Sequence, residues 1–60
     1  MASVATLENK LERLQSSRSN MQRLLERAAN DSTRNWASLE IQNLDAAIAS
    51  AEAELEAARA

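Results

Sequence analysis

The chain has 60 residues, no cysteine or histidine, and seven basic against nine acidic side chains, which give a net charge of −2. A unit this small is usually stabilised by disulfides, a metal ion or oligomerisation. Without cysteine there are no disulfides, and without histidine as well a zinc site is strongly disfavoured, so the composition points to oligomerisation. The usual general base and thiol nucleophile are also missing, so we expect no enzymatic activity and no cofactor.

The first predicted element is a helix over about residues 4–29. The sequence contains no glycine or proline, the two residues that most often interrupt helices. Ser3 and Thr6 are both candidate N-caps. An apolar heptad stripe then continues without a slip, through Val4, Leu7, Leu11, Leu14, Arg18, Met21, Leu25 and Ala28.

A tight turn is predicted over about residues 30–33, the only cluster of residues that favour turns and caps. Asn30 is a candidate for the left-handed conformation that ends a helix, and Asp31 or Ser32 for the cap of the next helix. Ala28 and Ala37 are nine residues apart, two more than one heptad. Since coiled coils absorb insertions of three or four residues, this spacing favours a turn over one continuous helix.

The second predicted helix covers about residues 33–58 and carries a second heptad stripe. Its members are Ala37, Ile41, Leu44, Ile48, Ala51, Leu55 and Ala58. When the chain is folded back, the two stripes face each other in pairs whose residue numbers add to 62, such as Leu7 with Leu55. We call the two facing stripes the apolar seam. The prediction is an all-α, coiled-coil-like antiparallel hairpin.

One narrow seam buries little surface, so we expect the hairpin to associate. A homodimer that forms a four-helix bundle is favoured, and a trimer or tetramer of hairpins stays open. Residues 1–30 carry a net charge of +2 and residues 31–60 a net charge of −4, which suits helices lying side by side.

Arg18 is the one charged member of the seam, and in the predicted pairing it faces Leu44 with Asp45 beside it. A polar group in a core position can fix register and oligomeric state at some cost in stability. Alternatively, the arginine stem packs over the seam while the guanidinium reaches water or Asp45. Contact with a ligand or RNA is the third reading.

Four apolar residues near the turn form a candidate interface with a second copy or another protein, and we call them the turn-end cluster: Met21, Leu24, Trp36 and Leu39. Trp36 is the only aromatic residue and lies about 100° from the centre of the second stripe. Tryptophan is enriched among interface hot spots. A dimer contact, a contact with a different partner, and a plug folded over the turn are the three interpretations.

Three arginines, Arg13, Arg23 and Arg27, fall within an arc of about 80° on the outer side of the first helix. Such a stripe can follow nucleic-acid phosphates. The chain is acidic overall and places no aromatic residue beside these arginines for base stacking. A solvated face is therefore the favoured interpretation, and nucleic-acid binding the alternative.

In size and layout the predicted hairpin resembles the small plasmid RNA-binding regulator ROP, a family of roughly sixty-residue hairpins that dimerise into antiparallel four-helix bundles. Residues 44–55, LDAAIASAEAEL, resemble the C-terminal helix of small phage head–tail joining proteins. That family has a β-hairpin between its helices, whereas residues 27–34 here contain no glycine and no strand-forming run. The two resemblances imply an RNA-binding regulator and a virion-assembly protein, respectively.

The expected location follows from what the sequence lacks. It has no apolar run of about 18 residues, and Met1–Val4 has neither the basic nor the apolar region of a signal peptide. We therefore expect a cytoplasmic protein, or a virion protein if the chain comes from a phage. Taken together, the sequence predicts a non-enzymatic structural or adaptor protein, with a ROP-like RNA-binding regulator as the alternative.

Overall fold

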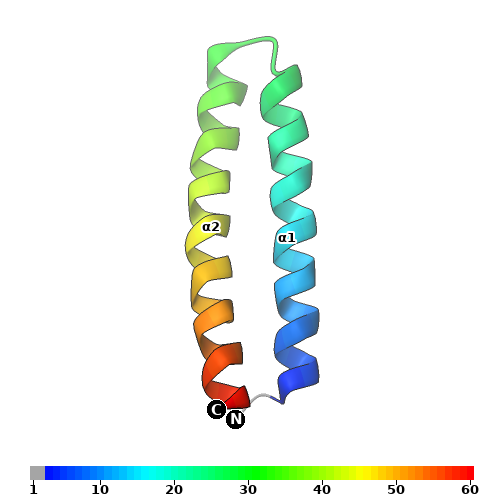
Figure 1. Cartoon of the computed structure of the whole chain (residues 1–60). Coiled ribbons are helices and arrows are strands. Elements are labelled where there is room, and N and C mark those ends of the chain that lie inside the picture. Colours follow the sequence, from blue (N-terminus) through cyan, green and yellow to red (C-terminus); the bar gives the residue numbers. More distant parts are fainter. Residues whose placement is uncertain (1–2) are drawn as a thin grey trace.

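The computed structural model describes residues 3–60 and shows two helices, α1 (Val4–Arg27) and α2 (Asp31–Arg59). They run side by side in opposite directions and are joined by a short connection at one end (Figure 1). The molecule is a rod of 44 × 14 × 13 Å. The predicted all-α helical hairpin is confirmed. Of the segment considered for a signal peptide, Met1 and Ala2 lie outside the described residues.

The start of α1 is fixed by Ser3, which has an extended backbone and accepts a hydrogen bond from the Thr6 amide at 3.1 Å. This bond satisfies one of the amides that a helix leaves unpaired at its N-terminus. Of the two candidate caps, Ser3 is therefore the cap, and Thr6 is the residue whose amide it binds.

The connection covers residues 28–30, two to three residues earlier than predicted. Asn30 does not adopt the left-handed conformation for which it is a candidate, since its φ and ψ of −137° and 161° are extended. Neither of the candidate caps, Asp31 or Ser32, caps α2, because Asn30 takes this role and accepts a hydrogen bond from the Thr33 amide at 2.8 Å. Asparagine caps helices as well as aspartate or serine does. With Asn30 as the cap, α2 begins at Asp31, whose negative carboxylate is stabilised by the helix dipole at the N-terminus.

The core lies along the seam between the helices. Every seam position is buried or half-buried, and the buried side chains among the described residues all belong to it: Leu7, Ala37, Ile41, Ala51 and Leu55. Leu7 and Leu55, a predicted pair, are 3% and 6% exposed. The seam therefore contains the whole described core, and this core is one side chain deep.

The hydropathy of the helices decides whether either of them could span a membrane. Over residues 3–60, neither helix combines the length and the apolar character that a membrane span requires.

Candidate interaction surface

The turn-end cluster contains the two large apolar side chains that are exposed among residues 3–60. Trp36 and Leu39, in the first turns of α2, are 50% and 59% exposed. Met21 and Leu24, in the last turns of α1, are half-buried. The pairing of the seam brings Leu24 level with residue 38, so the four side chains lie around one end of the molecule. A foreign or second surface laid on this end would remove them from water.

The exposure of Trp36 and Leu39 follows from their positions outside the seam on α2. Ala37 is fully buried in the seam, and Trp36 precedes it by one residue, which rotates the indole about 100° away from α1. Trp36 and Leu39 are spaced by three residues and are therefore neighbours on the surface of α2. Half of Trp36 stays exposed, so the hairpin by itself leaves indole surface for a further contact.

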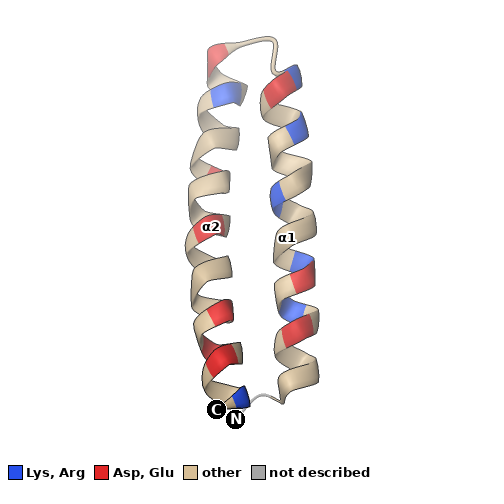
Figure 2. Ribbon diagram, in the orientation of Figure 1, with Lys and Arg blue, Asp and Glu red and all other residues tan. Residues whose placement is uncertain are grey.

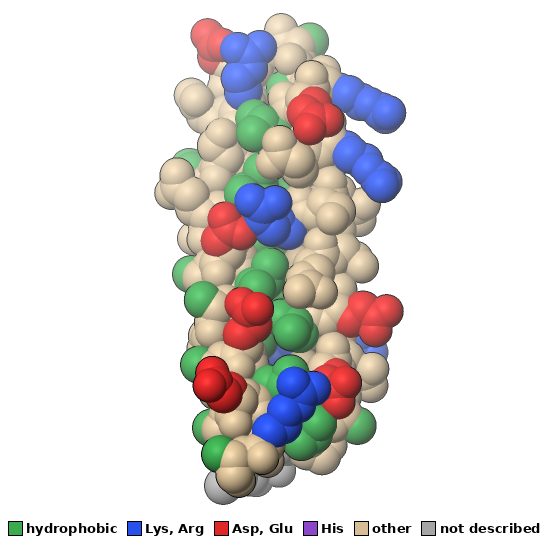
Figure 3. Space-filling model, viewed as in Figure 1, with side chains coloured by type: hydrophobic (Ala, Val, Ile, Leu, Met, Phe, Trp, Pro, Cys, Tyr) green, Lys and Arg blue, Asp and Glu red, His purple; other side chains and the backbone are tan. Residues whose placement is uncertain are grey.

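Ion pairs occupy a different side of the hairpin. Arg18 Nε donates to Asp45 Oδ1, and Arg59 approaches the Glu8 carboxylate at 3.7 Å, so both pairs connect α1 with α2. Figure 3 shows this side, with side chains of both charges beside the line where the helices meet. Asp45 is nine residues from Trp36, which places it about 180° around α2. We call the side that carries these pairs the ion-paired face.

The predicted proximity of Arg18 and Asp45 is confirmed. Their side chains are 40% and 51% exposed, so solvent screens the pair, and it contributes about 0–1 kcal/mol. The guanidinium thus reaches the rim of the seam while the residue as a whole stays half-buried within it. Whether this polar position sets the register or the oligomeric state is a prediction that its replacement can test.

The arginines Arg13, Arg23 and Arg27 are all exposed, and none forms an ion pair with another residue of the 3–60 segment. Positive and negative positions mix along α1, whereas acidic positions gather in the C-terminal half of α2 (Figure 2). The only described aromatic side chain, Trp36, comes from the other helix. The structure therefore gives the arginines solvent access without assembling a stacking platform around them.

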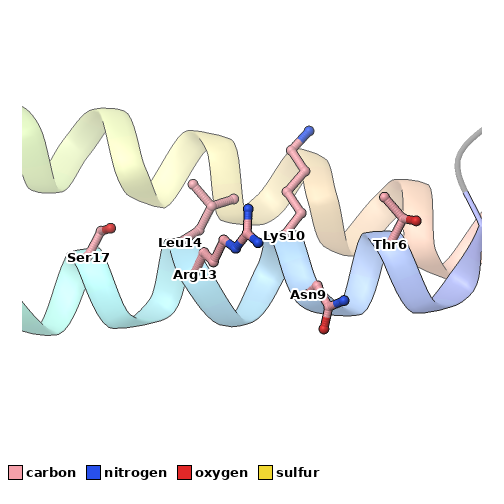
Figure 4. A pocket seen from close by; sticks show the side chains of 6 residues that line it. All are labelled: Thr6, Asn9, Lys10, Arg13, Leu14 and Ser17. Atoms are coloured by element: carbon pink, nitrogen blue, oxygen red, sulfur yellow. The ribbon is translucent and has the colours of Figure 1, made fainter.

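Sequence reasoning missed a shallow hollow of about 390 Å³ along the N-terminal half of α1. Its lining comes from this helix alone and consists of Thr6, Asn9, Lys10, Arg13, Leu14 and Ser17. In Figure 4 the side chains of Lys10 and Leu14 extend toward α2, while Asn9 points away from it. The facing half of α2 is rich in alanine, whose small side chain cannot fill the space beside Lys10. The long side chains of α1 opposite the alanines of α2 are the sequence feature from which this hollow could have been predicted.

The described residues do not assemble a metal centre, since no group of three or more acidic side chains in the 3–60 segment is close enough to hold an ion. Comparison with protein-family models, with curated proteins and with solved structures finds no match to this chain.

Proposed function

We propose that the chain is a non-enzymatic structural or adaptor protein that acts by self-association and by binding other proteins. The observation that carries this proposal is the half-exposed Trp36 beside Leu39, at one end of a hairpin whose core is one side chain deep. Burying the remaining surface of a large aromatic side chain is among the strongest single contributions that an interface can gain. The roles that follow are cytoplasmic, or within a virion if the chain comes from a phage.

The favoured assembly is a homodimer in which two hairpins form a four-helix bundle. Its supporting argument is size, because a two-helix unit leaves one side of each helix without a packing partner. A second hairpin supplies that partner without requiring any other protein. This layout is also the one implied by the resemblance to ROP.

The alternative is a ROP-like regulator that binds RNA through Arg13, Arg23 and Arg27. Their exposure and their freedom from ion pairs within residues 3–60 favour it. If it is correct, replacing all three by alanine abolishes RNA binding, and binding by the original chain weakens steeply with salt. If the chain binds no RNA at low salt, or the triple variant binds as well as the original, this alternative is lost.

Sedimentation equilibrium across a micromolar concentration series tests the main proposal. We expect a dimer that dissociates on dilution, accompanied by a red shift in tryptophan emission as Trp36 returns to water. The emission reports on one site only, because Trp36 is the only aromatic residue. A folded monomer with unchanged emission at all concentrations would contradict self-association.

A further inference from the structure

The face opposite the ion-paired face carries charges of opposite sign on its two helices. Glu54 is eighteen residues from Trp36, five full turns, so both project from the same side of α2. On α1, Lys10 and Arg13 lie within about 40° of Leu24 around the helix. Toward the open end of the hairpin, away from the turn, this face is therefore basic on α1 and acidic on α2. Toward the turn it carries the apolar side chains of Leu24 and Trp36, together with the carboxylate of Glu40.

The hollow on α1 lies at the basic end of this face. Lys10 and Arg13 supply its two positive charges, and Thr6 and Ser17 add hydroxyl groups. In the seam pairing Lys10 is level with residue 52, within one helical turn of Glu54. A helix that fills the hollow must have small side chains on the packing side. It must also place a negative charge at the level of Lys10, because Lys10 and Arg13 are both positive.

We propose that the occupant is α2 of a second copy of this chain, whose Glu54 carboxylate lies against Lys10 and Arg13. This proposal rests on the self-association proposed above and specifies its geometry. The segment from Ala46 to Ala57 fits the hollow because its side chains on this side of α2 are mostly Ala and Ser. Opposite charge supplies the orientation, and the small side chains allow close approach of the two helices.

The arrangement has a two-fold axis parallel to the helices, with both turns at the same end. Each α1 then packs on the α2 of the other copy, so Trp36 of one copy meets Leu24 of the other. All neighbouring helices are antiparallel. Turning one copy end over end would instead place α1 on α1 and α2 on α2. That alternative sets Glu40 against Glu54 and leaves both indoles over the polar open end.

Glu40 is a position where removing a charge should strengthen the dimer instead of weakening it. It is half-buried on the same face, near the level of Met21, and no positive side chain of the described segment pairs with it there. Association would remove this carboxylate further from water, which costs free energy when the charge has no partner. We therefore expect Glu40→Gln to tighten the dimer.

Charge reversal in separate chains tests the pairing. Lys10→Glu alone and Glu54→Lys alone should each weaken the dimer by about tenfold, since each reversal acts twice across the two-fold axis. A mixture of the two variants should recover the original affinity as a heterodimer, because every reversed site then faces its reversed partner. An ion pair within one hairpin cannot produce this recovery. Glu52→Lys, about 160° from Glu54 around α2, is the matched control and should leave the affinity unchanged.

A distance measurement separates this geometry from self-association in general. The chain has no cysteine, so Ala29→Cys introduces one label site at the turn. We expect spin labels in the dimer to lie about 20 Å apart, given neighbouring helix axes about 8–10 Å apart and the length of the label arms. A dimer with labels close to 44 Å apart, the length of the hairpin, would overturn this geometry and leave self-association standing. A chain that stays monomeric would overturn both proposals. Circular dichroism of each variant confirms that the helices are intact.

Discussion

The apolar seam and the two exposed residues of the turn-end cluster, Trp36 and Leu39, are both apolar, yet the hairpin covers only the seam. Leu7 in the seam is 3% exposed, whereas Leu39 in the cluster is 59% exposed. The seam is covered within the same chain, whereas Trp36 and Leu39 of the cluster stay 50% and 59% exposed. Apolar residues therefore serve two purposes in this molecule, because the seam holds the helices together and the cluster is available to another surface.

The largest expected effect belongs to the seam. Leu7→Ala should lower the free energy of unfolding by about 2–4 kcal/mol, because it removes buried methyl groups and leaves a cavity against Leu55. The same change at Leu39 is the control and should shift stability by less than about 0.5 kcal/mol. Urea unfolding followed by circular dichroism at low protein concentration measures both. Equal losses at the two leucines would abolish the distinction between seam and cluster.

The next effect belongs to the cluster. Trp36→Ala should weaken self-association by about 30-fold, or about 2 kcal/mol, while leaving the helix content unchanged. Its exposed neighbour Asn35 provides the control, and Asn35→Ala should associate like the original chain. Sedimentation equilibrium measures the dissociation constants. If the two variants dissociate alike, Trp36 is not part of the contact.

A smaller effect is expected at the turn that joins the two regions. Asn30→Ala should lower the free energy of unfolding by about 1 kcal/mol, since it leaves the Thr33 amide without its cap. Asn30→Asp should restore stability. Asn43→Ala, an exposed change within α2, should be neutral or slightly stabilising because alanine favours helix. Thermal unfolding of the three variants compares them, and a neutral Asn30→Ala would show that the seam alone places the turn.

The smallest effect is expected at the polar interruption of the seam. Arg18→Leu should raise the melting temperature by a few degrees, because an apolar side chain replaces a screened ion pair. Sedimentation of the same variant shows whether the oligomeric state changes, which a role in specifying assembly requires. Asp45→Asn removes the charge of the partner alone and should change stability very little. A lower melting temperature with unchanged assembly would contradict the register hypothesis for Arg18.

Much of the fold could be predicted because heptad periodicity is a local property of the chain. The stripe positions, the two helices and the contact between Arg18 and Asp45 all follow from spacing. The turn was placed two to three residues late, because Asn30, Asp31 and Ser32 have similar capping preferences and their order alone does not decide which one acts. The cap falls on Asn30, whose side chain binds the Thr33 amide in the folded chain.

For the candidate interaction surface, too, some features follow from the sequence and others only from the tertiary structure. The sequence by itself determined that Trp36 and Leu39 fall outside the seam, because their angular positions on a helix are fixed by residue number. Only the tertiary structure decided how much of each side chain stays in water and where the hollow beside Lys10 and Arg13 lies. These features depend on how closely two helices approach and on which side chains fill the space between them, and both depend on residues far apart in the sequence.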